Sequence, residues 1–276
     1  MGGGFPTEVR DDAGRRLRLE EPPATIVSLV PSLTELLFAL GAGDAVVGVT
    51  RYCTHPPAET ARLPRLGGTK NPDLDAIVAL RPGLVLMNAE ENRREDFEAL
   101  DARGLPIYVT EPKTVDDGIA LNARLAEIVG RGAAGTALVQ AQRDILAAVR
   151  TPERTGRPVR YFCPIWKRPW MGFNADTYAH DVLRCAGGMN VLADRPERYP
   201  TVDLAGLAPA VPDVVLLPDE PYVFTAADIP ALAPLGNAPA LACDRVHLVD
   251  GKALSWYGPR IADGVRAFAA LFDAAR

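Results

Sequence analysis

Residues 76–86 of the chain, AIVALRPGLVL, are matched 130 positions later by residues 206–216, GLAPAVPDVVL. Each stretch combines a short helical run, a proline that stops it and an apolar strand. The same offset carries Glu90, just beyond the first strand, onto Glu220 beyond the second. A repeat of this kind indicates two similar α/β units within the chain.

Outward from the first copy, strand-like apolar runs alternate with helical segments, which predicts parallel sheets covered by helices. In the first half these runs span 26–30, 46–50, 84–87 and 106–109, after a hairpin at 8–19. Two helical segments, 114–129 and 133–149, follow with no strand between them, and a strand at 159–165 restarts the alternation. We expect two Rossmann-like α/β lobes bridged by a long helix, with a cleft between them. Their expected bounds are 1–130, a bridging helix and joint at 131–157, and 158–276.

The composition excludes several classes of protein. Hydrophobic residues make up 48 % of the chain, which supports a sizeable core and excludes a disordered protein. The net charge is −5 and the basic residues are scattered, so we expect no nucleic-acid partner. The four cysteines form no Cys-x-x-Cys pair, which excludes a zinc ribbon.

Targeting features are missing from the sequence as it stands. No apolar stretch approaches the roughly 18 residues that are needed to span a bilayer. The first residues, MGGGFPTEVRDDAGRR, contain neither the apolar core nor the cleavage site of a secretory signal. We expect a cytoplasmic protein, or a periplasmic or cell-surface one if a signal sequence has been removed.

In open α/β sheets, ligands bind beyond the carboxyl ends of the strands. Unusual polar and aromatic residues follow the predicted strands at those ends, and all three tryptophans are among them. The candidates are Arg51, Tyr52, Cys53, His55, Lys70, Glu90, Glu91 and Asn92 in the first half, and Trp166, Arg168, Trp170, Glu220, Tyr222, Trp256 and Tyr257 in the second. Tryptophans in loops favour a flat, exposed surface on which a ligand stacks, and packing between the lobes is the alternative.

Two other kinds of chemistry stay open. Cys53 and His55 could bind a metal, because both side chains point the same way on an extended segment, and His55 alone could be an axial ligand of cobalt or iron. Glu90 and Glu220 could form a catalytic carboxylate pair. The chain has no Ser/His/Asp order, no phosphate-binding glycine loop and no His-Glu-x-x-His motif, so we expect no enzymatic activity.

The chain resembles the substrate-binding proteins of iron-chelate and cobalamin ABC importers, the helical-backbone metal receptors, over about residues 7–275. The motifs that carry this resemblance include PSLTE at 31–35, LGAG at 40–43, IVALRP at 77–82 and GGMN at 187–190. A narrower resemblance, to a subgroup labelled cobalamin-binding, lies in CTHP at 53–56, GGTKNP at 67–72, EENR at 90–93, IWKRPWM at 165–171, EPY at 220–222 and SWYG at 255–258. Members of that subgroup commonly lack a signal peptide.

The resemblance implies the fold of class III periplasmic binding proteins, and a cobalamin-like corrinoid or related metal chelate as ligand, with no cofactor required. It also implies docking to an importer permease through one acidic residue in each lobe. Asp75 occupies the first of these positions, whereas Ala205 occupies the second and Asp203 is the nearest acid. An intracellular corrinoid carrier is therefore an alternative to a receptor that serves an importer.

The leading hypothesis is a monomeric receptor whose aromatic residues contact a planar macrocycle while cations contact its polar rim. The residues in these two roles are Tyr52, Trp166, Trp170, Trp256 and Tyr257 for the rings, and Arg51, Lys70 and Arg168 for the rim. A receptor for a ferric siderophore or haem is the second hypothesis, with arginine and lysine meeting carboxylate or catecholate oxygens. A metal-ion binder using Cys53 and His55, and an enzyme acting on a bound cofactor, are less favoured.

Overall fold

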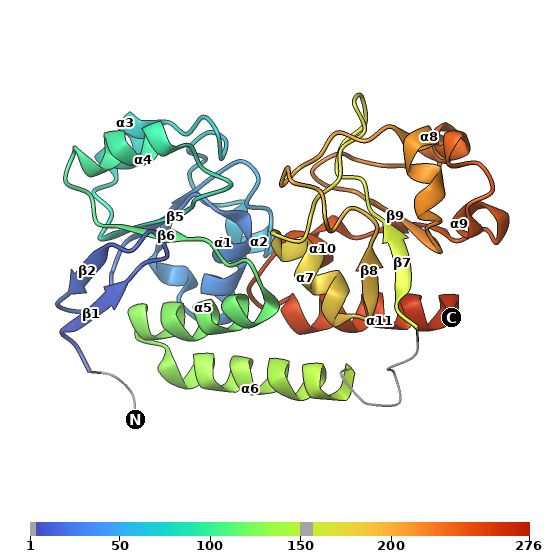
Figure 1. The fold of residues 1–276 in the computed structure, drawn as a ribbon. Coiled ribbons are helices and arrows are strands. Elements are labelled where there is room, and N and C mark those ends of the chain that lie inside the picture. Colours follow the sequence, from blue (N-terminus) through green and yellow to red (C-terminus); the bar gives the residue numbers. More distant parts are fainter. Residues whose placement is uncertain (1–3, 150–156) are drawn as a thin grey trace. The chain divides into compact units, whose positions relative to one another are not determined.

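The computed structural model describes residues 4–149 and 157–276. These residues divide into two compact units, which we call the first and the second lobe (Figure 1). The first lobe comprises residues 4–112, 116–141 and 257–259, and the second comprises 113–115, 142–149, 157–256 and 260–276. Residues 150–156, most of the predicted joint, lie outside the described residues.

Helix α6 (Gly132–Val149) is the longest in the described part of the chain, and it carries the chain from one lobe to the other. The lobe boundary falls within it, between Ala141 and Gln142. Within the two described stretches, no helix is both long and apolar enough to cross a membrane.

A four-stranded parallel sheet forms the centre of the first lobe, in the order β4-β3-β5-β6. Its strands are β3 (Ile26–Ser28), β4 (Val46–Val49), β5 (Leu84–Asn88) and β6 (Ile107–Thr110). An antiparallel hairpin of β1 (Thr7–Arg10) and β2 (Arg16–Leu19) is tied to β6, because the Asp12 N–H donates to the Val109 carbonyl at 3.0 Å. Every residue of β5 and β6 is buried, as expected for a parallel sheet covered on both faces.

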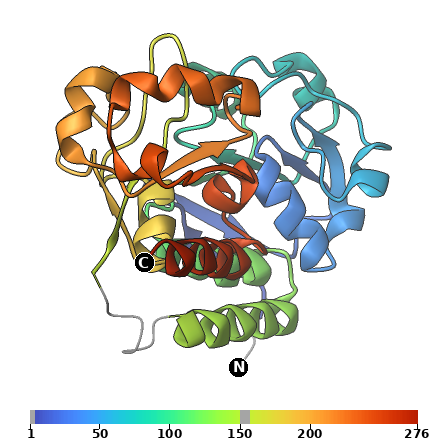
Figure 2. The ribbon, with the colours of Figure 1, turned by 90° about the vertical axis from the view of Figure 1, so that its right-hand side faces the viewer.

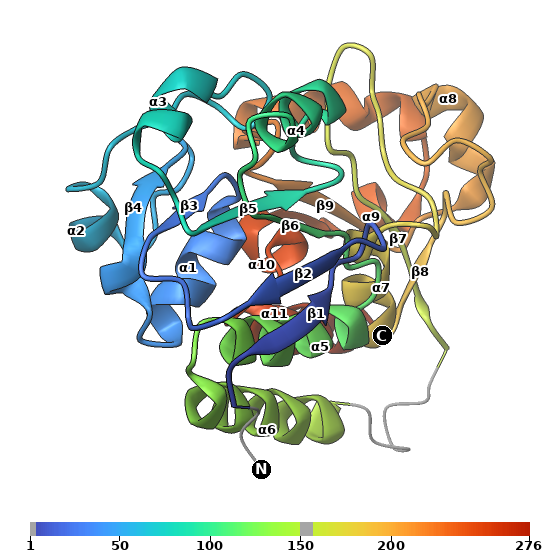
Figure 3. The same ribbon diagram turned by 90° about the vertical axis from the view of Figure 1, so that its left-hand side faces the viewer.

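Helices cover both faces of this first sheet (Figure 3). The helical segments of the lobe are α1 (Pro31–Ala39), η1 (Gly43–Ala45), α2 (Pro57–Thr60), α3 (Leu74–Ala79), α4 (Arg94–Asp101) and α5 (Val115–Ile128). Ile77 of α3 and Leu100 of α4 share one buried cluster with Val85 and its neighbours in the sheet. Helices α1 and α5 lie on the opposite side (Figure 3).

The second lobe has its own four-stranded parallel sheet, in the order β10-β9-β7-β8. Its strands are β7 (Val159–Phe162), β8 (Gly188–Asn190), β9 (Val214–Pro218) and β10 (Val246–Val249). Its helical segments are α7 (Tyr178–Cys185), α8 (Leu204–Leu207), η3 (Ala208–Ala210), η4 (Ala226–Leu235), α9 (Pro239–Ala242), α10 (Gly251–Ser255) and α11 (Ile261–Ala275). Segments α8, η4 and α9 join one core cluster with Phe162 and Val215. From α11, the red helix in Figure 2, Phe272 stacks on Tyr161 with ring centroids 5.8 Å apart.

The two lobes share one topology, since each sheet has the order 2-1-3-4 when its strands are numbered along the chain. Strands β5 and β9 begin and end 130 residues apart, which is the predicted offset. Asp73 caps the helix before β5, and Asp203 caps the helix before β9. Arg81 and Val211, one residue before the matched prolines, both have positive φ angles, 45° and 49°. The predicted pair of similar α/β lobes with parallel sheets is confirmed.

Candidate functional site

The strand-end loops of the first lobe are hydrogen-bonded to one another. The Arg51 N–H donates to the Gly67 carbonyl at 2.8 Å, which joins the loop after β4 to the segment 67–72. The Lys70 ammonium donates to the Glu90 carbonyl, which joins that segment to the loop after β5. Three predicted ligand-binding regions are thus brought together at the carboxyl end of one sheet.

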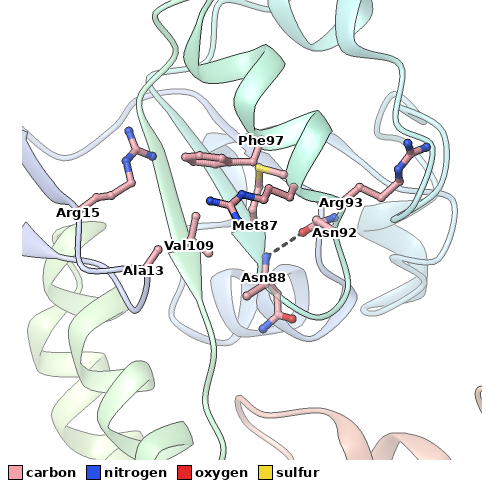
Figure 4. A pocket seen from close by; sticks show the side chains of 10 residues that line it. Ala13, Arg15, Met87, Asn88, Asn92, Arg93, Phe97 and Val109 are labelled. Carbon is pink, nitrogen blue, oxygen red and sulfur yellow. Dashed lines mark hydrogen bonds between the residues drawn. The ribbon is translucent and has the colours of Figure 1, made fainter. Parts of the chain in front are cut away.

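Asn88 and Asn92 order the loop after β5 (Figure 4). The Asn92 side-chain oxygen accepts the Asn88 N–H at 2.8 Å, and its amide group donates to the carbonyls of Leu29 and Thr69 at 3.2 and 3.0 Å. The Asn88 side-chain oxygen accepts the backbone N–H groups of residues 90 and 91. Asn92 is buried, so its amide holds three chain segments in place and its role lies in positioning the loop.

Exposed polar and aromatic groups surround this ordered loop framework. Tyr52 is 55 % exposed, and the Arg51 guanidinium lies 5.9 Å from the centre of its ring. The Thr54 hydroxyl lies 3.0 Å from Nδ1 of the half-buried His55. Glu90 and Glu91 are half-buried, and Lys70 is exposed. These side chains are accessible at the position where the topology predicts a ligand.

Cys53 differs from its neighbours because its side chain is fully buried. Its Sγ lies 3.1 Å from the hydroxyl oxygens of both Thr34 and Thr50, and burial raises the pKa of the thiol. A protonated thiol in an internal polar cluster is a poor metal ligand, since metals bind the thiolate. Among the described residues, no group of three or more His, Cys, Asp or Glu side chains could hold a metal ion.

Tyr257 belongs to the first lobe although it is distant from that lobe in sequence. Its ring is buried, and burial raises the pKa of the phenol well above its ordinary value, with a further contribution from the Glu91 carboxylate. The Asn122 amide donates to the adjacent Gly258 carbonyl at 3.1 Å. Tyr257, which the sequence analysis assigned to the rings that contact the ligand, is therefore buried in the interior of the lobe.

Four aromatic rings form a continuous cluster in the second lobe. Trp166 contacts Tyr222 edge to face, with ring centroids 5.6 Å apart, and Tyr222 lies 4.6 Å from Phe224. Phe224 stacks on Trp170 at 5.7 Å with an interplanar angle of 7°. Trp166, at one end, is 43 % exposed, whereas Phe224 is buried. The sequence analysis missed Phe224, which its place just beyond Tyr222 could have indicated.

A buried ion pair lies next to this aromatic cluster. The Lys167 ammonium lies 2.6 Å from Oδ1 of Asp228, and both side chains are almost fully buried. The other oxygen of Asp228 accepts the Thr225 N–H at 2.9 Å, and the pKa of Asp228 is lowered chiefly by the hydrogen bond from Lys167. Arg168 follows in an exposed turn with a positive φ of 73°. Neither Lys167 nor Asp228 was among the predicted site residues.

Trp256 was expected to have an exposed ring, but only 8 % of its surface is accessible. The guanidinium of Arg260 lies 5.5 Å from its ring centre, and its indole donates a hydrogen bond to Glu220. The Ser255 hydroxyl donates to the same carboxylate at 3.3 Å, and the Lys252 ammonium lies 3.8 Å away. The structure therefore places Trp256 and Glu220 in one half-buried polar cluster.

Burial raises the pKa of Glu220 above its ordinary value of 4.5, and it outweighs the opposing effects of Lys252 and the two hydrogen bonds. The ionised carboxylate therefore destabilises the folded lobe above its raised pKa, and protonation removes this cost as the pH falls through that value. We expect Glu220→Gln to gain stability relative to the wild type as the pH rises from 4 to 7. Urea unfolding at several pH values measures this difference, and a pH-independent difference would contradict the expectation.

The two predicted docking residues have different surroundings. The Asp75 side chain is 90 % exposed, and one oxygen lies 3.1 Å from the Arg103 guanidinium. Asp203 caps α8, and its two oxygens accept the N–H groups of Ala205 and Gly206 at 3.3 and 3.0 Å. Asp203 is also exposed, but both of its oxygens are engaged in capping the helix, which distinguishes it from Asp75.

The chain is similar to proteins of known sequence and structure. The family model described as "Periplasmic binding protein" matches residues 26–227. The vitamin B12-binding protein of Vibrio cholerae is 28 % identical over 195 residues, which cover 70 % of each chain. The solved structure of the periplasmic vitamin B12 binding protein BtuF of Vibrio cholerae is 26 % identical with a TM-score of 0.81, covering 92 % of this chain and 98 % of that one. The periplasmic heme-binding protein RhuT from Roseiflexus sp. RS-1 is 27 % identical with a TM-score of 0.78, covering 91 % and 99 %.

Proposed function

Because the chain belongs to the periplasmic binding protein family, we propose that it is a receptor for one metal chelate, with a cobalamin-like corrinoid as the favoured ligand. The similar proteins described above are named for vitamin B12 and heme, which are both macrocyclic metal chelates. Family members are solute-binding proteins, so we assign Glu90 and Glu220 to binding and positioning and not to catalysis.

The observation that carries this proposal is the aromatic cluster of the second lobe, which ends in the exposed ring of Trp166. A rigid aromatic surface at the carboxyl end of a sheet suits a large, partly apolar ligand, because stacking and burial of apolar area supply affinity without covalent chemistry. Tyr222 supports Trp166 from the side, so the exposed ring keeps its orientation when the ligand is absent.

The first lobe supplies groups of a different kind. Arg51 and Lys70 are cations on the rim of its strand-end loops, where they can meet the amide or carboxylate groups of a chelate. We include His55 as a candidate axial ligand, because an imidazole binds cobalt or iron and the Thr54 hydroxyl orients its ring. The buried thiol of Cys53 then supports the loop from inside.

Delivery to an ABC importer is the proposed use of the bound chelate, as in the family that the chain resembles. Asp75 offers an exposed carboxylate on the first lobe. The position equivalent to Asp75 in the second lobe is Ala205, and Asp203 is engaged as a helix cap. This asymmetry favours an intracellular carrier as the second candidate function. Pull-down of an importer permease by this protein would support the receptor, and its failure would support the carrier.

Cobalamin titrated into the protein should quench its tryptophan fluorescence to saturation. We expect Trp166→Ala to weaken binding by roughly 30-fold, the size of effect that follows truncation of an aromatic anchor. Tyr199→Ala is the matched control, because Tyr199 is 41 % exposed on the same lobe but lies outside the cluster. An equal loss of cobalamin affinity in both variants would show that Trp166 is not part of the binding site.

Haem and a ferric siderophore serve as parallel titrants. If only one of them quenched the fluorescence to saturation and cobalamin did not, that chelate would be the ligand instead of a corrinoid, and the receptor function would still hold. The prediction that one ligand contacts the loops of both lobes stays a prediction, and Tyr52→Ala in the same titration tests it. A cobalamin affinity unchanged in Tyr52→Ala would remove that residue from the site.

A further inference from the structure

The aromatic cluster of the second lobe is built from two loops that are far apart in the sequence. Trp166 and Trp170 lie in the loop that follows β7, whereas Tyr222 and Phe224 lie in the loop that follows β9. Each ring contact joins one loop to the other, because Tyr222 meets Trp166 and Phe224 stacks on Trp170. The orientation of the exposed Trp166 ring therefore depends on how the two loops are held together.

The loop after β7 forms a turn that is closed at its base. The Met171 N–H donates to the Trp166 carbonyl at 3.1 Å, and the Ile165 N–H donates to the Met171 carbonyl at 2.8 Å. Trp166 and Met171 thereby pair as in an antiparallel ladder, and Lys167 lies inside the turn that they close. A contact that fixes Lys167 consequently also restrains Trp166, its neighbour at the base of the turn.

Lys167 connects this turn to the loop after β9. Its ammonium lies 2.6 Å from Oδ1 of Asp228, and only 13 % and 12 % of the two side chains are exposed. The same ammonium lies 5.7 Å from the centre of the Trp170 ring. Asp228 is itself held in place, because it forms a capping box with Thr225 at the start of η4. The ion pair thus joins the two loops beside the rings that they contribute.

We propose that Lys167 and Asp228 are positioning residues of the chelate site, which hold the Trp166 ring in the orientation that stacks on the ligand. This inference rests on the proposed function, in which Trp166 contacts the chelate. A ring that is already held in place loses less conformational freedom when the ligand binds. The apparent affinity falls in proportion to the fraction of molecules that keep the ring in the competent orientation.

Calorimetric titration with cyanocobalamin measures this effect on the full chain without relying on tryptophan fluorescence. We expect Lys167→Met to weaken binding roughly tenfold, which corresponds to a competent fraction of about one tenth. Asp228→Asn removes the charge of the other partner at nearly constant side-chain size and should weaken binding to a similar extent. Unchanged affinity in either variant overturns the proposal.

A loss of stability alone could also weaken binding, so the matched control is destabilised elsewhere in the same lobe. Leu183→Ala truncates a fully buried side chain of α7, outside the core cluster that contains Phe224. It should lower the melting temperature at least as much as Lys167→Met but leave the affinity unchanged at a temperature where every variant is folded. An equal loss of affinity in Leu183→Ala overturns the positioning role.

A double-mutant cycle tests whether Lys167 acts through Trp166. Trp166→Ala has no ring to position, so adding Lys167→Met to it should cause no further loss of affinity. A further tenfold loss in the double variant would mean that Lys167 affects the ligand by another route, and would overturn the proposal.

The same titrations separate this inference from the proposed function. Haem and the ferric siderophore replace cyanocobalamin if the wild-type protein binds one of them instead. A wild-type protein that binds none of the three refutes the proposed function and this inference with it. A wild-type protein that binds one of them, with an affinity that Lys167→Met leaves unchanged, refutes this inference alone.

Discussion

Lys167→Met is expected to destabilise the second lobe by roughly 2–3 kcal/mol, because removing one partner of a buried ion pair leaves the other charge uncompensated. Asp228 would keep its buried carboxylate and its hydrogen bonds from Thr225, but lose its contact with the ammonium at 2.6 Å. The expected value is at the lower end for buried pairs, since about a tenth of each side chain remains exposed. Urea unfolding followed by tryptophan fluorescence measures the loss specifically in this lobe, because all three tryptophans belong to it.

The control for this variant is Lys113→Met in the same lobe. Lys113 pairs with Asp176 at 3.1 Å, but both side chains are about half exposed, so we expect a loss below about 1 kcal/mol. Combining Lys167→Met with Asp228→Asn should cost less than the sum of the two single changes, because the pair is lost only once. If the stability losses of the two single variants were additive in the double variant, Lys167 and Asp228 would not stabilise each other.

Asn92→Ala should destabilise the first lobe by about 2–3 kcal/mol, because it removes three hydrogen bonds from a buried position. The carbonyls of Leu29 and Thr69 and the N–H of Asn88 would lose their partner together. The loops at 67–72 and 88–93 should then open more often, so the amides there should exchange hydrogen faster. Hydrogen-exchange mass spectrometry of peptides that cover these loops gives the readout, since the first lobe contains no tryptophan.

Asn71→Ala is the matched control, because Asn71 is an exposed asparagine in the same segment. A surface change of this kind is usually worth less than about 0.5 kcal/mol. Equal exchange rates in Asn92→Ala and Asn71→Ala would mean that Asn92 does not order the loops, and would return it to the candidate ligand-binding residues.

The elements that sequence predicted well are those whose determinants are local. Prolines 82 and 212 stop their helices, and the apolar runs that follow them are strands because no helical period fits them. The offset between the two lobes holds from the capping aspartates to the last residue of β5 and β9. The same local information placed the candidate residues at the carboxyl ends of the strands.

Side-chain exposure at the candidate site could not be predicted in this way. Trp166 lies in the loop after β7 and Trp256 directly after α10, and the first is 43 % exposed whereas the second is 8 % exposed. Trp256 is contacted by Lys252 and Arg260, its near neighbours in the chain, and also by Glu220 from a distant segment, which accepts a hydrogen bond from its indole. Sequence spacing does not record such convergence.

The sequence by itself therefore determined the order of elements, the two-lobe repeat and the positions of the strand ends, where a ligand is expected, since short-range periodicity and helix-stopping residues specify these features. Only the tertiary structure decided which candidates are accessible. It buried Cys53 among threonine hydroxyls, assigned Asn92 to holding loops together, and joined Lys167 to Asp228 across 61 positions of the chain. The physical reason is that burial and hydrogen-bond satisfaction depend on neighbours brought together by folding, whereas the strand and helix patterns depend on neighbours along the chain.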